Sequence, residues 1–398
     1  MSTIAAASAA ATVAVAAPAR SYPALSTSCG VISDQDPVWE PQGRFIGFTR
    51  VSGSGSASEV FRIGLDGRRL RRLSRPGEYA YELRWSPDGT RIAYATFDLA
   101  AFVRIVVARA DGSGARVVAG FQFEREPPTT FLSWSPDASR LVFDDWTRGI
   151  EVVDVGSGEE RTITRSGTQP SWSPDGRRLV YADEGGVTVA AVDGSDAHVI
   201  APGGAFPAWS PDGAWIAYAS RTGAGVHIVA ANGGGDRLLD PRGTMPVWSP
   251  GGRRLLDVTD PSARARPALH MIDVARGRVR AITHDGSKRF GADDFAPSFA
   301  PKRKLIAFSS ASLSGVPTLG GSEIRFVRPD GRAERRLTYH CGAVDDGLGT
   351  RMVGTWLDDV MLARNGHRDT IVCGPGDDVV VADRRDRAAH DCESVQRG

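Results

Sequence analysis

The chain has 398 residues, and its 48 basic and 47 acidic side chains give a formal charge of +1. This balance disfavours a dedicated nucleic-acid binder, because such proteins carry a strong basic excess. The length accommodates two or three ordinary domains or one large repeat array.

Residues 1–19 form an uncharged segment rich in alanine and valine that ends in Ala17-Pro18-Ala19. The A-x-A ending suits signal peptidase, so we predict a signal peptide over 1–19 and an extracytoplasmic protein, either secreted or held in the periplasm or cell envelope. A leader without a targeting role is the alternative. No later run of 18 apolar residues occurs, and we therefore expect no transmembrane helix.

A motif built on tryptophan then recurs along the chain at intervals of 37 to 51 residues. Its anchor residues are Trp39, Trp85, Trp134, Trp172, Trp209, Trp248 and Phe299. Most anchors are followed by Ser-Pro-Asp-Gly or a near copy. Proline presets φ for a type I turn, aspartate suits the next position, and glycine accepts the positive φ that follows. A motif that recurs in this way indicates architecture rather than catalysis.

Each anchor is followed at fixed distances by apolar residues. An aliphatic residue stands seven positions later in every repeat, and an aromatic residue stands nine positions later in six of the seven repeats, with Asp257 as the exception. These two positions share one face of a strand, because strand side chains alternate. Each repeat therefore predicts a strand that ends at the anchor, a turn, and three further strands, which is one propeller blade.

The motif, its offsets and the strand order resemble the TolB-type WSPDG β-propellers over residues 36–340. The resemblance implies an all-β propeller, which we place at 30–341. Counting one blade per anchor gives seven blades, and six is the alternative because the TolB family has six. We expect each tryptophan to wedge between neighbouring blades and the turns to line one rim.

The segment 342–398 differs in composition. Its stretch Cys373-Gly374-Pro375-Gly376-Asp377-Asp378-Val379 fits the pattern G-G-x-G-x-D-x, except that Cys replaces the first Gly. It resembles the haemolysin-type (RTX) calcium-binding nonapeptide, which implies a small C-terminal parallel β-roll. Carried over by position, the resemblance implies calcium ligands at Asp359, Asp369, Asp378, Gly374 and Gly376, since calcium takes oxygen ligands. A metal-free roll held by a disulfide is the alternative.

The chain has four cysteines and no CxxC pair, which favours two disulfides over metal ligation. Cys29 lies just before the first repeat and Cys341 just after the last, so a bond between them would close the circle. We pair Cys373 with Cys392 in the tail. Disulfides also agree with export to an oxidising compartment.

Known catalytic motifs are missing from the sequence. It contains no G-x-S-x-G elbow, no H-E-x-x-H pair and no S-x-D-x-G-x-T-W box. We therefore predict an exported, monomeric, non-catalytic binding scaffold, not an enzyme, whose propeller face holds a protein or cell-envelope ligand. The alternative is a propeller glycoside hydrolase or polysaccharide lyase that uses two carboxylates in a central funnel.

Three long connections between second and third strands, at 51–58, 260–268 and 310–322, belong to repeats that a closed ring makes neighbours. Long loops on a rigid scaffold are often functional. We predict that the partner contacts this sector, and the candidate contact residues are Arg264, Arg266, Leu313, Val316 and Leu319. Tolerated surface insertions are the alternative.

Overall fold

The fold is seen in a computed structural model, which describes residues 32–52, 57–98, 100–123, 130–145, 147–221, 225–259, 268–283, 292–312, 322–338, 351–353, 360–363, 368–373, 379–389, 392 and 394–397. Every regular element of these residues is a β-strand. None of the described residues forms a helix long and apolar enough to cross a membrane.

The strands of the repeat region form antiparallel sheets in chain order. An eight-stranded sheet contains β1 (Ile32–Trp39), β2 (Phe45–Ser52), β3 (Ala57–Gly64), β4 (Arg71–Arg72), β5 (Tyr79–Trp85), β6 (Arg91–Phe97), β7 (Phe102–Arg109) and β8 (Arg116–Gln122). Its two halves meet through a single parallel pair, Ser58 with Tyr79.

Five four-stranded sheets follow. Their strands are β9 (Leu132–Trp134), β10 (Arg140–Asp145), β11 (Gly149–Asp154) and β12 (Glu160–Thr164); β13 (Thr168–Trp172), β14 (Arg178–Asp183), β15 (Gly186–Ala191) and β16 (His198–Pro202); β17 (Gly204–Trp209), β18 (Trp215–Ser220), β19 (Val226–Ala230) and β20 (Arg237–Asp240); β21 (Gly243–Trp248), β22 (Arg254–Thr259), β23 (Leu269–Asp273) and β24 (Arg278–Ala281); and β25 (Ala292–Phe299), β26 (Ile306–Ser312), β27 (Ser322–Val327) and β28 (Arg335–Arg336).

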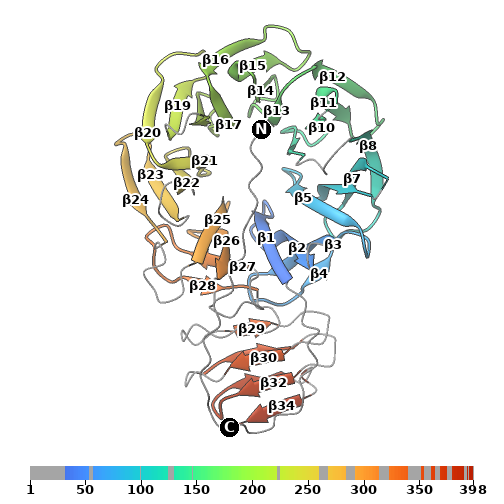
Figure 1. The fold of residues 1–398 in the computed structure, drawn as a ribbon, viewed down its shortest axis with the longest axis vertical. Coiled ribbons are helices and arrows are strands. Elements are labelled where there is room, and N and C mark those ends of the chain that lie inside the picture. Colours follow the sequence, from blue (N-terminus) through green and yellow to red (C-terminus); the bar gives the residue numbers. More distant parts are fainter. Residues whose placement is uncertain are drawn as a thin grey trace, which may run out of the picture.

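The anchor residues end the strands that surround the centre of the molecule. These inner strands are β1, β5, β9, β13, β17, β21 and β25. Each contacts the next, and β25 contacts β1, so the strands form a closed ring (Figure 1). The predicted all-β propeller fold is therefore confirmed, together with the prediction that each anchor closes a first strand.

The tryptophans link one sheet to the next. The indole Nε1 of Trp134 donates to the carbonyl of Arg84 at 3.2 Å, and Trp248 donates to Ala208 at 2.9 Å. In both cases the acceptor lies on the preceding inner strand. Trp39 donates to Ser298 at 3.1 Å, which joins the first inner strand to the last. For Trp39, Trp134 and Trp248, these contacts confirm that the tryptophan lies as a wedge between neighbouring sheets.

The repeated turns are held by their own side chains. In the turn after Trp85, the hydroxyl of Ser86 donates to Asp88 at 2.5 Å and accepts from the N–H of Arg91 at 2.9 Å. Gly89 has φ of 70°, in the region that favours glycine. The serine and aspartate thus satisfy local hydrogen bonds, which explains their recurrence without any catalytic role.

The ring closes by packing rather than by strand exchange, since among the described residues the first and last sheets contain only strands consecutive in sequence. Phe48 and Phe61 of the first repeat share a buried cluster with Phe326 of the last. Ser322 donates its N–H to Ser33 Oγ at 3.0 Å, and its hydroxyl donates to the carbonyl of Asp34 at 2.9 Å.

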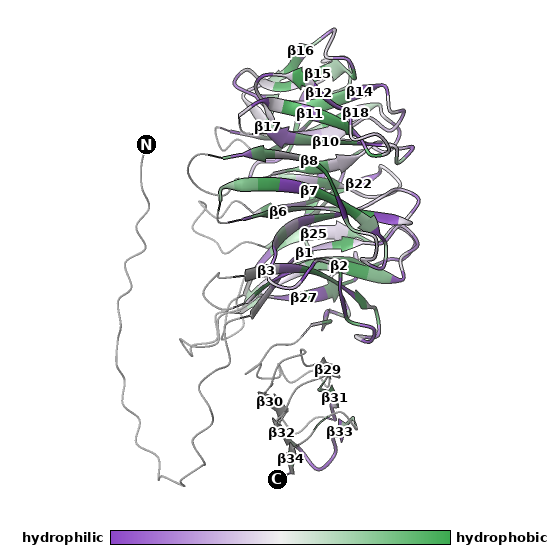
Figure 2. Ribbon diagram, turned by 90° about the vertical axis from the view of Figure 1, so that its right-hand side faces the viewer, coloured by the Kyte–Doolittle hydropathy of each residue, from purple (hydrophilic) through white to green (hydrophobic). Residues whose placement is uncertain are grey.

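The C-terminal strands form two parallel three-stranded sheets, which lie apart from the propeller strands in Figure 2. One contains β29 (Arg351–Val353), β31 (Thr370–Val372) and β33 (Arg387–Ala388), and the other contains β30 (Val360–Ala363), β32 (Val379–Ala382) and β34 (Ser394–Arg397). A disulfide joins Cys373 to Cys392, the pair predicted for the tail. Cys29 and Cys341 lie outside the described residues.

Candidate functional site at the centre of the ring

The inner strands carry a recurring irregularity three residues before the anchor. In six of them the residue at this position has a positive φ, between 49° and 58°, although none is glycine. The ladder to the second strand shifts register at the same place, as a β-bulge does. We name the residues at this position the axial residues: Asp36, Glu82, Phe131, Gln169, Phe206, Met245 and Ala296. Phe131 precedes β9 and is the one without a positive φ.

Two of the axial residues, Phe131 and Phe206, meet across the centre of the ring. The rings of Phe131 and Phe206 lie 6.5 Å apart, although β9 and β17 are separated by β13 in the ring. Side chains of non-adjacent inner strands can make such a contact only by reaching toward the axis. Gln169 Oε1 accepts the N–H of Phe206 at 2.6 Å, so one axial side chain satisfies the next bulged backbone. Met245 is 47% exposed, so solvent reaches this axial position.

Two of the axial residues are carboxylic acids on adjacent strands. Glu82 accepts a hydrogen bond from Arg84 Nη2 and another from the N–H of Leu132. Burial raises the pKa of Glu82 to about 7, and the nearby Asp36 adds to this rise while Arg84 opposes it. Desolvation by the surrounding protein also raises the pKa of Asp36, and the positive charge of Arg84 opposes this rise. Asp36 is nevertheless exposed to solvent. A solvent-accessible acid that is nevertheless poorly hydrated is expected where protein surrounds it on several sides.

This arrangement allows two kinds of chemistry. A carboxyl group with a pKa near neutrality beside a second carboxylate can act as a general acid or base, provided that a substrate reaches it. Alternatively, the two acids can bind a cationic group while Phe206 and Met245 offer apolar contacts.

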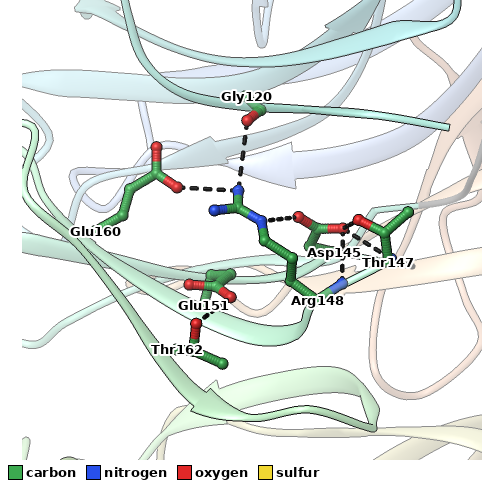
Figure 3. Close-up of polar contacts among 7 residues, drawn as sticks. All are labelled: Gly120, Asp145, Thr147, Arg148, Glu151, Glu160 and Thr162. Atoms are coloured by element: carbon green, nitrogen blue, oxygen red, sulfur yellow. Dashed lines mark hydrogen bonds and ion pairs between the residues drawn. The ribbon is translucent and has the colours of Figure 1, made fainter.

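A second polar cluster lies at the connection between β10 and β11 (Figure 3). Arg148 pairs with the buried Asp145 at 2.6 Å and with Glu160 at 3.0 Å, and the Glu151 carboxylate accepts from Thr162 at 2.8 Å. Burial raises the pKa of Glu151. Because hydrogen bonds from Thr147 and the backbone also reach Asp145, these carboxylates are satisfied within the fold, and the cluster is best explained as structural.

Most of the residues predicted as binding or metal sites fall outside the described residues. These are the partner-contact residues Arg264, Arg266, Leu313, Val316 and Leu319, and the calcium candidates Asp359, Asp378, Gly374 and Gly376. Their roles stay predictions. Asp369 is described and fully buried, and its N–H donates to Asp386 Oδ1 at 2.9 Å. Asp386 Oδ2 accepts the N–H of Asp383 at 2.7 Å, so both carboxylate oxygens of Asp386 accept backbone hydrogen bonds.

Sequence reasoning missed the axial residues. They share only their distance from the anchor, because their types range from aspartate to phenylalanine and alanine. A bulge at a non-glycine residue has no local signal in this sequence. The fixed offset from each tryptophan was the one available indication.

Comparison with known proteins supports the fold. Residues 83–239 match the family described as the TolB beta propeller domain. A segment of 55 residues is 49% identical to Tol-Pal system protein TolB 1 of Novosphingobium aromaticivorans. That match spans 14% of this chain and 12% of that protein. Residues 83–239 are therefore TolB-like, and the functions of the whole relative do not follow from so short a match.

Solved structures with the same fold include enzymes. Oligogalacturonate lyase from Vibrio parahaemolyticus is 14% identical with a TM-score of 0.55, and the similarity covers 76% of this chain and 91% of that chain. Puromycin hydrolase is 16% identical with a TM-score of 0.57, covering 79% of this chain and 55% of that chain. These structures overturn the prediction that the chain is not an enzyme, since a fold shared with a lyase and a hydrolase gives no ground for excluding catalysis.

Proposed function

We propose that the chain is an exported binding propeller that holds a segment of a partner protein at the axial residues. The observation that carries the proposal is the composition of the axial set. Its acidic side, Asp36 and Glu82, lies in the same ring as Phe206 and the exposed Met245. Such a surface suits a peptide segment that presents a lysine or arginine next to an apolar side chain. The TolB-like sequence of residues 83–239 favours a protein partner.

We infer that the propeller has seven blades and acts as a monomer. Supporting the blade count, seven inner strands follow one another around the ring, and each ends at one anchor of the repeat. The two halves of the eight-stranded sheet then count as two blades, because one parallel pair joins them.

The proposed export is supported by the Cys373–Cys392 disulfide, because disulfides persist in oxidising compartments. Cleavage of the segment 1–19 would be detected by sequencing the N-terminus of the protein isolated from the producing cell. Recovery of the intact leader on a cytoplasmic protein would contradict export.

Site-specific photo-crosslinking tests the proposed binding site. A photoreactive phenylalanine analogue replaces Phe206 at the axis, or Leu238, which is 47% exposed on the outermost strand β20. We expect a discrete crosslinked protein from position 206 in producing cells and none from position 238. Equal crosslinking from both positions, or crosslinking from position 238 alone, would place the partner elsewhere.

A second candidate function is carbohydrate cleavage, and one observation favours it. Glu82 has a pKa of about 7 beside Asp36, which suits an acid–base pair acting on a glycosidic bond. Purified protein would be assayed on chromogenic glycosides and on acidic polysaccharides. Activity that Glu82→Gln abolishes and that Asp175→Asn retains would establish this function, since Asp175 belongs to a structural turn. Full activity in Glu82→Gln would exclude Glu82 as the catalytic group.

We also propose that the tail is a β-roll that binds calcium through Asp359, Asp369 and Asp378. The parallel pairing of Val360 with Val379, and of Arg351 with Thr370, supports stacked coils. When bound, calcium would take oxygen ligands from these residues and neutralise their carboxylates.

A further inference from the structure

The sixth repeat breaks the pattern of the others at one buried position. Where six repeats have Phe or Tyr nine residues after the anchor, this repeat has Asp257 on β22. In the fifth repeat the corresponding Tyr218 ring packs on Gly204, and a Cβ added there would lie 2.7 Å from the ring. In the sixth repeat a Cβ added to Gly243 would lie 1.8 Å from Asp257 Oδ2. A short carboxylate thus occupies a position that elsewhere holds an aromatic ring.

Two further potential ligands face Asp257. His270 lies directly opposite it on β23, and Asp240 ends β20 of the preceding sheet. His270 Nδ1 is 2.8 Å from Asp240 Oδ2 and 3.9 Å from Asp257 Oδ1. One ligand atom from each residue lies within 4.8 Å of the others. Three different strands therefore bring two carboxylates and one imidazole to a single point.

The cluster is buried, and one of its members is not satisfied by the protein. Asp240, Asp257 and His270 are 1%, 0% and 5% exposed. Within the described residues, neither oxygen of Asp257 accepts a hydrogen bond. A buried carboxylate without a hydrogen-bond donor is costly, and in folded proteins such a group is normally paired or bound to a metal.

The other two side chains are already oriented. Asp240 Oδ1 accepts the N–H of Arg242 at 2.9 Å, which fixes the carboxylate with Oδ2 directed at the cluster. His270 Nε2 lies 3.4 Å from Thr259 Oγ1, so its Nδ1 faces the carboxylates. Hydrogen bonds of this kind hold metal ligands in place in known sites.

We propose that Asp240, Asp257 and His270 form a binding site for one divalent transition-metal ion, with zinc as the best match. Two carboxylates balance the charge of a divalent cation. The imidazole nitrogen favours zinc over calcium or magnesium, which prefer oxygen ligands only. Three protein ligands leave a fourth coordination position for water or another ligand. The site does not include an axial residue, so it is independent of the proposed function.

The test uses the full chain after removal of metals with a chelator. Isothermal titration with zinc chloride is expected to show one tight site per chain, and saturating zinc is expected to raise the melting temperature by several degrees. Calcium and magnesium serve as comparison ions and should compete weakly at this site. X-ray absorption of the zinc-loaded protein should show nitrogen and oxygen ligands at roughly 2.0–2.2 Å.

Variants assign the binding to this cluster. Asp257→Asn and Asp257→Tyr are expected to lose the tight site, and the tyrosine restores the residue type of the neighbouring repeat. Both variants should fold, because asparagine has nearly the size of Asp257 and tyrosine stands at the corresponding position of the fifth repeat. His227→Gln is the matched control, since His227 holds the same register against Tyr218 in the fifth repeat. Retention of the tight site in Asp257→Asn, or no stoichiometric zinc binding by the parent chain, would overturn the proposal.

Discussion

The contribution of the indole hydrogen bonds to stability can be measured by comparing two tryptophans. Trp134 and Trp172 are 7% and 5% exposed, and each lies under an arginine, with the guanidinium carbon 5.2 Å and 4.9 Å from the ring centre. Trp134 donates to the carbonyl of Arg84 at 3.2 Å, whereas within the described residues the Trp172 N–H has no partner. The two sites thus differ mainly in one hydrogen bond.

Replacing either residue by alanine should lower the free energy of unfolding by about 3–5 kcal/mol, because a large buried side chain is removed. Replacement by phenylalanine should separate the two sites. Trp134→Phe leaves the Arg84 carbonyl without its donor, while Trp172→Phe removes an unpaired buried N–H. We expect Trp134→Phe to cost about 1–2 kcal/mol more than Trp172→Phe.

The assay is equilibrium unfolding in urea, followed by far-ultraviolet circular dichroism on the parent chain and the four variants. A cost for Trp172→Phe that equals or exceeds that of Trp134→Phe would refute the assignment of the hydrogen bond. A decrease in the free energy of unfolding below about 1 kcal/mol in either alanine variant would refute the conclusion that the tryptophan is packed as a wedge between neighbouring sheets.

Three further predictions concern titration, the disulfide and calcium. Burial raises the pKa of Glu82 from 4.5 to about 7 in the folded protein, so the contribution of this group to the free energy of unfolding is fully present below pH 4.5 and is lost as the pH rises through 7, by about 3 kcal/mol. Melting temperatures of Glu82→Gln measured from pH 4 to pH 8 should lack this pH-dependent fall, and a profile identical to that of the parent chain would contradict the prediction. Replacing both Cys373 and Cys392 by serine should destabilise the tail by about 3 kcal/mol, because the disulfide closes a loop between residues 19 positions apart. Limited proteolysis should cut the tail of this variant faster than that of the parent chain, and equal cleavage rates would contradict a stabilising role of the disulfide. Calcium, but not magnesium, should raise the melting temperature of the parent chain and not that of Asp378→Asn; no response to millimolar calcium would leave a metal-free tail.

The repeat made the propeller predictable from sequence, because its physical causes are local. Ser86, Asp88 and Gly89 form a turn through their own hydrogen bonds and φ, so the turn motif marks each strand boundary without knowledge of the rest of the fold. The alternation of apolar residues after each anchor likewise reflects the strand itself. Because these interactions are local, the predicted end of each inner strand agrees with the structure at every anchor.

The sites were not predictable to the same degree, because their causes are tertiary. The bulge at Glu82 interrupts the pairing of β5 with β6, and the raised pKa of its carboxyl comes from burial among residues that are distant in the sequence, such as Asp36 and Leu132. Asp257 was visible as the one exception among the aromatic positions. Its partners Asp240 and His270 lie on other strands, and no spacing in the sequence connects the three residues.

The central claim is that a partner is held at the axis of the ring through the acids Asp36 and Glu82. Its most direct measurement is the yield of crosslinked partner from the photoreactive residue at position 206, compared between the parent background and an Asp36→Asn, Glu82→Gln background. We expect the yield to fall at least about tenfold, as loss of a close charge pairing predicts, while the melting temperature shows that the propeller remains folded. An unchanged yield in the folded double variant would contradict the claim.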